Sequence, residues 1–162
     1  MRGLDLSGLT TYNLDLDFVP LLKKAGVSLD LKNATPEERV KQARAMADAN
    51  KSFSNKVEKT IEGKQNFVLD GTAASYKKTE ALVEELKKAG YEVFMLYVYT
   101  DLEKSLKQNE LRFQASGGKD RSLAPAIVLK TWNNVTQNYG PYRALFGDDN
   151  FISVANLSLI HI

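Results

Sequence analysis

The run from residue 92 to 99 (EVFMLYVY) restricts the fold more than any other part of the 162-residue sequence, because almost every position in it is apolar. A strand that is covered on both faces, as in a parallel sheet, has this continuous apolar pattern. The next four residues, 100–103 (TDLE), have the pattern of a capping box and predict a helix to about Phe113. We therefore expect a β-α unit whose strand is buried on both faces.

The same alternation of strand and helix recurs along the chain. Residues 66–70 (NFVLD) form a short apolar run, and after Gly71 and Thr72 the pattern predicts a helix from 75 to 89. Further strands are predicted at 10–13 and 151–155, and further helices at 18–25, 35–62 and around 127–135. These elements predict an α/β fold, with a mainly parallel sheet sandwiched by helices.

Several local features are also predicted. Asp15 and Asp17 are plausible caps of the first helix, and residues 27–34 are expected to be a polar connection. Thr35 opens the long helix with a capping box. The loop 114–122 (QASGGKDRS) is expected to be mobile, because it is small, polar and rich in glycine. The long helix is expected to bury one apolar face, made of Val40, Ala43, Ala47, Phe53, Val57 and Ile61.

Composition excludes several classes of function. The 22 basic and 20 acidic residues leave a net charge of +2, so a nucleic-acid partner is not indicated, although it is not excluded. The absence of cysteine excludes disulfides and thiolate chemistry. The longest apolar stretch is far shorter than a membrane span, so we expect no membrane partner and a soluble, cytoplasmic protein, in a host cell if it is phage-encoded.

The last six residues, 157–162 (LSLIHI), match the translation of a sequencing adapter. We expect them to be adapter read-through and not part of the fold, which leaves residues 1–156 as the domain. They contain His161, the only histidine, so histidine-based catalysis loses its one candidate.

Polar residues follow the predicted strands at the ends where α/β proteins bind ligands. Asn13 ends the first strand and Asp15 follows it, whereas Asp70 ends the second strand and precedes Gly71 and Thr72. We predict that Asn13, Gly71 and Thr72 bind substrate at this edge. Mg²⁺ prefers oxygen ligands, and Asp70 is the best candidate to bind it, directly or through water.

The strand-end segments 13–15 (NLD) and 66–72 (NFVLDGT), the stretch 109–112 (NELR) and the loop residue Arg121 together resemble P-loop kinases of the zeta-toxin and polynucleotide-kinase-like group, including phage-encoded members. The resemblance extends over nearly all of residues 9–156. It implies a sheet with strand order 2-3-1-4-5, use of ATP and Mg²⁺, and transfer of phosphate to a hydroxyl of a nucleotide, a nucleotide sugar or a related small molecule.

The resemblance also implies roles for single residues. Asp15 corresponds to the carboxylate that the family places against the substrate hydroxyl, and Asp70 ends the strand beside the phosphate loop. Arg112 and Arg121 correspond to the lid that closes over the ATP phosphates. Phosphoryl transfer requires such residues, since it depends on positioning and on neutralising charge at the phosphoryl oxygens. Simpler structural roles stay open: Asp15 as a helix cap, Asp70 as a turn residue, and the two arginines as solvated surface charges.

The family's phosphate loop, G-x-x-x-x-G-K-[ST], occurs nowhere in the chain. Residues 3–10 (GLDLSGLT) imitate its spacing, but Leu9 stands where the lysine is needed. We therefore expect a truncated kinase domain that lacks strand 1 and its loop, with residues 1–9 as the end of the helix after that loop, and we expect the fragment to be inactive. Without strand 1, its two neighbours in the sheet either pair directly or leave a slot.

Two other interpretations are kept. The chain could be a complete, non-catalytic α/β binding module on a kinase-like scaffold. It could also be a polynucleotide end-binding protein, although the nearly balanced charge gives no basic groove for one.

Overall fold

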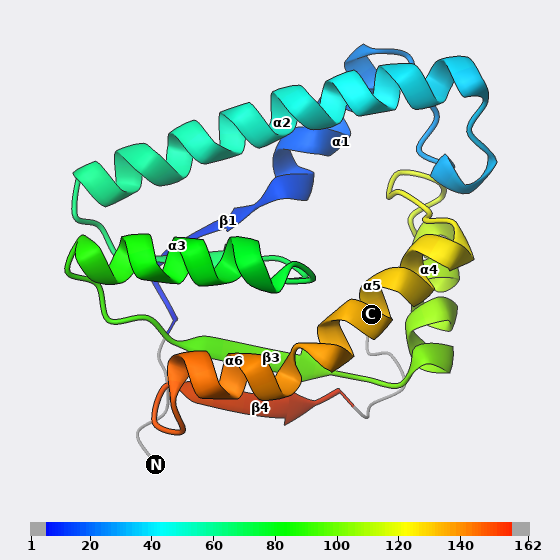
Figure 1. Cartoon of the computed structure of the whole chain (residues 1–162). Helices are drawn as coiled ribbons and strands as arrows, with labels where there is room; N and C mark the ends of the chain where they lie inside the picture. The colour runs from blue at the N-terminus through cyan, green and yellow to red at the C-terminus, as the bar shows by residue number, and fades with distance from the viewer. Residues whose placement is uncertain (1–5, 157–162) are drawn as a thin grey trace. The chain divides into compact units, whose positions relative to one another are not determined.

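The computed structural model describes residues 6–156 (Figure 1). The expectations for residues 1–5 and 157–162 lie outside this range. Within it the chain forms two compact units, the first made of residues 6–29 and 33–71 and the second of residues 30–32 and 72–156. The elements, in chain order, are β1 (Thr10–Asn13), α1 (Leu14–Lys24), the 3₁₀ turn η1 (Leu31–Asn33), α2 (Pro36–Glu62), β2 (Phe67–Asp70), α3 (Tyr76–Lys88), β3 (Met95–Tyr99), α4 (Leu102–Ala115), α5 (Pro125–Gln137), α6 (Tyr139–Phe146) and β4 (Phe151–Ala155).

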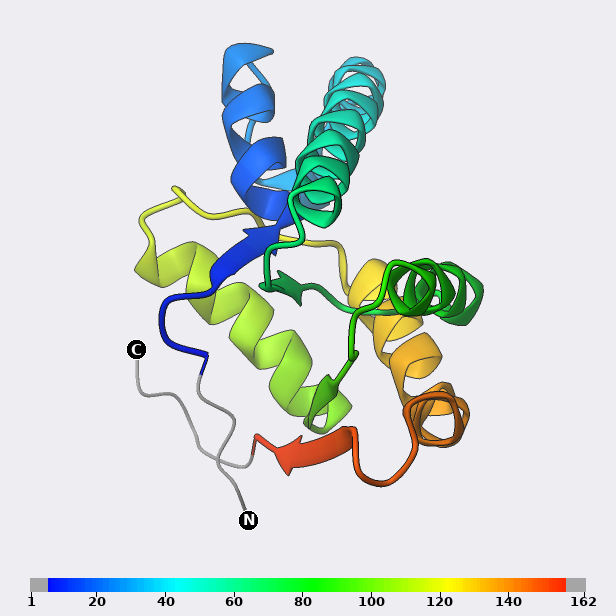
Figure 2. The same cartoon turned by 90° about the vertical axis from the view of Figure 1, so that its left-hand side faces the viewer.

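In the first unit, β1 and β2 form a parallel pair that runs in register from Thr10 opposite Phe67 to Asn13 opposite Asp70. The α1 and α2 helices lie side by side in both views (Figures 1 and 2). Phe18 and Leu22 of α1 are buried at 1% and 0% exposure and form the centre of this helix pair. Because an apolar side chain of this size contributes about 1.5–3 kcal/mol when it is buried, these contacts account for much of the unit's stability.

Two predictions about the first unit's helices are corrected. The buried positions of α2 are Ala45, Ala49, Val57 and Thr60, whereas Val40 is 55% exposed. Of the predicted apolar face, Ala43 and Ala47 are exposed as well, and Val57 is buried as predicted. The reason is that α1 packs against one side of α2, and Ala43 and Ala47 lie on a different side of the helix from the buried Ala45 and Ala49.

Residues 27–34 are not a polar connection. Val27, Leu29, Leu31 and Ala34 in this segment are all buried at 5–8% exposure. Every second residue from Val27 to Leu31 is apolar, so the segment can bury one side while its polar residues lie on the other.

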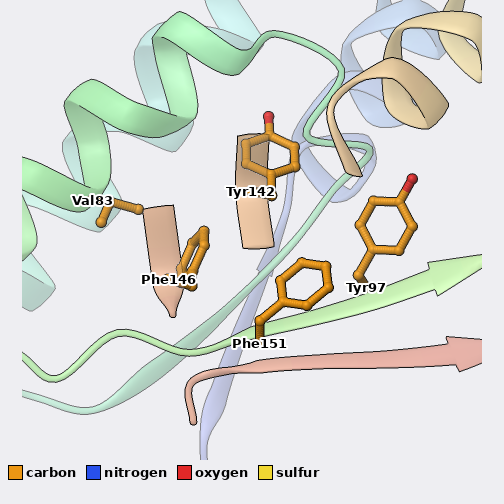
Figure 3. Close-up of a cluster of buried hydrophobic side chains, with 5 residues drawn as sticks. All are labelled: Val83, Tyr97, Tyr142, Phe146 and Phe151. Carbon is orange, nitrogen blue, oxygen red and sulfur yellow. The ribbon is translucent and has the colours of Figure 1, made fainter. Parts of the chain in front are cut away.

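In the second unit, β3 and β4 form a parallel pair with Met95 opposite Phe151. Its core consists of residues from α3, β3, α6 and β4, whose side chains face one another in Figure 3: Val83, Tyr97, Tyr142, Phe146 and Phe151. Aromatic rings dominate this core, and Tyr97 and Phe151 lie 5.7 Å apart between ring centroids. The expected helix from 75 to 89 and the last strand from 151 to 155 are confirmed as α3 and β4.

The prediction that residues 92–99 form a strand buried on both faces is wrong. β3 begins only at Met95, and Tyr97 is its one buried residue, whereas Leu96 and Val98 are 49% and 54% exposed. Ile152 and Val154 of β4 are exposed at 40% and 45% on the same face. The face that carries Tyr97 packs against α3 and α6.

The observed pairings are two of those that the order 2-3-1-4-5 requires. β1 with β2 corresponds to strands 2 and 3 of that order, and β3 with β4 corresponds to strands 4 and 5. The described residues contain no hydrogen-bonded ladder between β2 and β3. The fold is therefore α/β with parallel strands, and the order across both pairs stays a prediction.

The segment before β1 differs from the expectation for residues 1–9. Leu6–Leu9 is not helical; it forms a turn in which the Leu9 N–H donates to the Leu6 carbonyl at 3.3 Å. Gly8 in this turn has φ +81°, which favours glycine. A phosphate loop follows a strand and opens a helix, whereas this turn opens a strand, so its described residues do not form such a loop.

Candidate functional site at the carboxyl ends of β1 and β2

The parallel register of β1 and β2 brings two of the predicted site residues into contact. The Asn13 Nδ2 group donates to Asp70 Oδ2 at 2.8 Å, and the Asn13 Oδ1 atom accepts from the backbone N–H of Asp15 at 2.8 Å. Asn13 therefore caps α1 with one end of its amide and fixes Asp70 with the other. A single side chain joins the end of each strand to the beginning of the helix.

The sequence predicted Asp15 and Asp17 as caps of α1, but the structure shows that Asn13 is the cap. Both lie in the first turn, where the partial positive charge of the helix N-terminus stabilises a carboxylate. Asp17 accepts hydrogen bonds from Ser52 Oγ and Lys56 Nζ of α2, so it joins the two helices. Asp15 is half-buried and lies two residues after Asn13, and its role as the carboxylate that meets a substrate hydroxyl stays a prediction.

Asp70 itself is exposed at the end of β2. No group of three or more His, Asp or Glu side chains within residues 6–156 is arranged to hold a metal ion. Mg²⁺ does not need such a group, since in phosphoryl-transfer sites it is usually bound by one or two carboxylates together with phosphate oxygens and water. A single exposed carboxylate oriented by an amide fits this kind of binding.

The segment that follows Asp70 begins with Gly71 and Thr72, both of which are exposed. Next comes Ala73, which has φ +47°, an unusual conformation for a residue with a side chain. The hydroxyl of Tyr142 donates to the Ala73 carbonyl at 2.6 Å. Backbone strain of this kind persists where the surroundings hold it, and here it occurs three residues after a candidate metal ligand.

The two candidate lid arginines belong to the second unit. Arg112 lies exposed in the last turn of α4, where a cation complements the helix dipole. Arg121 lies half-buried in the loop between α4 and α5, and its backbone N–H donates to Asp120 Oδ1 at 2.7 Å. These two positions agree with lid residues and equally with surface charges, so their role stays a prediction.

The loop that carries Arg121 is held by more contacts than its glycine-rich sequence predicted. Asn109 of α4 exchanges two hydrogen bonds with the backbone of Leu123, at 3.0 and 3.1 Å. On the other side, the buried Ser122 hydroxyl donates to Asp30 Oδ1 at 2.7 Å. Asp30 and Asn109 thus fix the residues next to Arg121, and neither was singled out as a site residue from the sequence.

A signal existed for Asn109, because it opens the stretch NELR that carries Arg112. None existed for Asp30, since it lies 92 residues before Ser122. Long-range pairs of this kind have no local pattern.

The family model described as Zeta toxin matches residues 31–141. The chain belongs to the zeta toxin family. The match includes Asp70, Gly71, Thr72, Arg112 and Arg121, whereas Asn13 and Asp15 lie before it. Zeta toxins are P-loop kinases, so the chain has the scaffold of an ATP-dependent phosphotransferase, a class that typically uses Mg²⁺ and acts on nucleotide or small-molecule substrates.

Other comparisons add nothing to this assignment. No curated protein and no solved structure matches the chain. None of the helices between residues 6 and 156 combines the length and apolar composition that crossing a membrane requires.

Proposed function

We propose that the chain is the acceptor-side and lid part of an ATP-dependent kinase, and that its phosphate-binding loop is supplied by a segment outside these 162 residues. The missing motif G-x-x-x-x-G-K-[ST] is the reason for the second half of the proposal, since that loop makes most contacts with the ATP phosphates. The chain by itself is then expected to be inactive. The acceptor is a hydroxyl of a nucleotide, a nucleotide sugar or a related molecule.

The observation that carries the proposal is the Asn13–Asp70 hydrogen bond of 2.8 Å, with Asp15 in the next helical turn. It joins polar residues at the edge where α/β proteins bind ligands. In this proposal Asp15 orients the attacking hydroxyl and Asp70 binds Mg²⁺, whose charge would stabilise the phosphoryl oxygens in the transition state. Asn13, Gly71 and Thr72 line the acceptor site.

Arg112 and Arg121 are proposed to neutralise charge on the transferred phosphoryl group. A guanidinium group donates two parallel hydrogen bonds to phosphate oxygens, which suits this task. The hydrogen bond that Asn109 donates to the Leu123 carbonyl and the one that Asp30 accepts from the Ser122 hydroxyl restrict the loop next to Arg121. Such restriction lowers the entropy that the loop would otherwise lose when it binds phosphate.

The test is phosphate transfer from radiolabelled ATP to a panel of nucleotide sugars, nucleosides and oligonucleotide ends. The 162-residue chain should give no product, whereas the same chain preceded by a strand and a G-x-x-x-x-G-K-[ST] loop read from the upstream DNA should give product. Asp15→Asn in the loop-containing protein should lower kcat by about a hundredfold or more, since a general base contributes on this scale. Asp48→Asn, which changes an exposed carboxylate of α2, is the matched control and should leave kcat unchanged.

Two results would contradict the proposal. Turnover by the 162-residue chain would show that no further loop is needed. If no acceptor is phosphorylated by the loop-containing protein, or if an in-frame stop lies just upstream of Met1, the non-catalytic binding module would be favoured instead.

A further inference from the structure

Three residues of the segment between α1 and α2 belong by their contacts to the second unit, although the residues on either side of them belong to the first. These residues, Asp30, Leu31 and Lys32, form what we call the strap, which contacts the loop that carries Arg121. We infer that Asp30 is a positioning residue for Arg121. Through the strap, the order of the proposed lid loop then depends on the segment that joins α1 to α2. The inference rests on the proposed function, which gives Arg121 its role.

The main anchor of the strap is a pair of contacts between Asp30 and Ser122. The two residues form a parallel β-bridge, and the Ser122 hydroxyl donates to Asp30 Oδ1 at 2.7 Å. Ser122 is only 1% exposed, so water cannot readily replace the carboxylate as its partner. Hydrogen bonds to a carboxylate are also stronger than those between neutral groups. The position of Ser122, and with it that of the preceding Arg121, therefore depends on Asp30.

The polar contact that Lys32 adds to the strap is weak. Lys32 Nζ lies 3.5 Å from Glu110 Oε2 of α4, and the two side chains are 42% and 44% exposed. An ion pair this exposed contributes little, because water screens it and two long side chains must be ordered. Glu110 also accepts a hydrogen bond from Gln114 at 3.0 Å within α4, so it has a partner without Lys32. Asp30 should therefore hold the loop much more strongly than Lys32 does.

The other anchors of the loop come from α4 and from the loop itself. Asn109 bonds to the backbone two residues after Arg121, at 3.0 and 3.1 Å. On the other side of Arg121, the backbone N–H of Asp120 donates to Ser116 Oγ at 2.9 Å. Among these three anchors, Asp30 is the one that lies outside residues 109–123. It is therefore the anchor through which a distant part of the chain acts on the loop.

The placement of Arg121 matters because its proposed task is geometrically demanding. Two parallel hydrogen bonds from a guanidinium group to phosphate oxygens require one position and one orientation of that group. Small displacements of a reacting or stabilising group can cost a large part of the rate. Asp30 contacts the residue after Arg121 and is not itself proposed to touch a substrate. Its loss should therefore weaken what Arg121 does and leave acceptor binding unchanged.

Trypsin cleaves after arginine, so cleavage after Arg121 reports the order of the loop in the 162-residue chain without any enzymatic activity. The fragment that begins at Ser122 is quantified by mass spectrometry over time. Asp30→Ala should release it about tenfold faster or more, because cleavage follows the population of the locally open loop and a hydrogen bond to a charged group contributes on this scale. Asp30→Asn keeps an acceptor oxygen, so its rate should stay within about threefold of the wild type.

Three controls separate this effect from general changes in the chain. Lys32→Ala removes the exposed ion pair and should change the rate of cleavage after Arg121 by less than about twofold. Asp48→Ala removes an exposed carboxylate of α2 and should leave the rate unchanged. Cleavage after the exposed Lys64, in the first unit, is the internal reference and should be equal in Asp30→Ala and wild type. Faster cleavage after both residues would show a general loss of stability and would overturn the inference.

The loop-containing protein tests whether Asp30 acts through Arg121. Asp30→Ala should lower kcat about tenfold and leave the KM for the acceptor unchanged, because Arg121 is proposed to act on the transferred phosphoryl group. In an Arg121→Ala background, Asp30→Ala should lower kcat no further, since a positioning residue has no effect once the residue that it positions is gone. A merely structural role would lower kcat equally in both backgrounds.

Two further outcomes would overturn the inference: equal release of the Ser122 fragment from Asp30→Ala and wild type, or an equal loss of kcat with and without Arg121. These results are distinct from failure of the proposed kinase. Faster cleavage of Asp30→Ala, together with no turnover by the loop-containing protein, would retain the strap as the anchor of the loop and reject the kinase. Turnover by a protein in which Asp30→Ala changes neither cleavage nor kcat would do the reverse.

Discussion

Replacing Tyr142 by phenylalanine tests how the second unit holds the segment that follows the candidate metal ligand. The Tyr142 side chain is fully buried, and its hydroxyl donates to the Ala73 carbonyl at 2.6 Å and lies 3.1 Å from Thr79 Oγ1. Ala73 has φ +47°, a conformation that costs on the order of 1 kcal/mol for a residue with a Cβ. The hydrogen bond therefore holds a strained backbone in place.

The expected loss in the free energy of unfolding is about 2 kcal/mol. Leaving the Ala73 carbonyl without its partner costs about 1–3 kcal/mol, whereas the Thr79 hydroxyl can rotate toward another acceptor and adds little. The ring remains, so no cavity term is added.

Urea unfolding followed by the emission of Trp132 measures this change, because the only tryptophan belongs to the same unit. Tyr139→Phe is the matched control, since its exposed hydroxyl lies 3.5 Å from Ser153 Oγ and should contribute less than about 0.5 kcal/mol. If Tyr142→Phe is no less stable than Tyr139→Phe, the hydrogen bond to Ala73 does not hold the segment and the reasoning is wrong.

Three further predictions concern other parts of the chain. The pKa of Glu38 is lowered below 4.5, mainly by its hydrogen bond with the backbone of Thr35, so the folded chain binds the Glu38 proton more weakly than the unfolded chain. The wild type should therefore be more stable than Glu38→Gln at neutral pH. This advantage should disappear as pH falls below 4.5, as measured by acid unfolding. Burial raises the pKa of Tyr97 above 10.0. The contribution of protonated Tyr97 to the free energy of unfolding should therefore be complete below pH 10.0 and lost as pH rises beyond that value. Tyr97→Phe should show a shallower alkaline loss of stability. Asn109→Ala removes both hydrogen bonds to the Leu123 backbone and should speed tryptic cleavage in the loop 116–124 several-fold. The control Asn133→Ala changes an exposed residue of α5 and should not speed this cleavage. Equal cleavage of the two variants would refute the loop's dependence on Asn109.

Features that depend on near neighbours were predictable from the sequence. The capping box of Thr35 and Glu38 is present, because both partners lie within one helical turn. The strand at 10–13 and the helix that ends near residue 89 are also found as predicted. The strand-end position of Asp70 was equally readable, because it follows directly from where an apolar run stops.

Features that depend on distant partners were decided by the tertiary structure. Asn13 and Asp70 are 57 residues apart, and only the parallel register of β1 and β2 puts them in contact. The apolar run of β3 predicted burial on both faces, yet one face is exposed. An apolar pattern states what a strand can bury, whereas the amount buried depends on which elements pack against it.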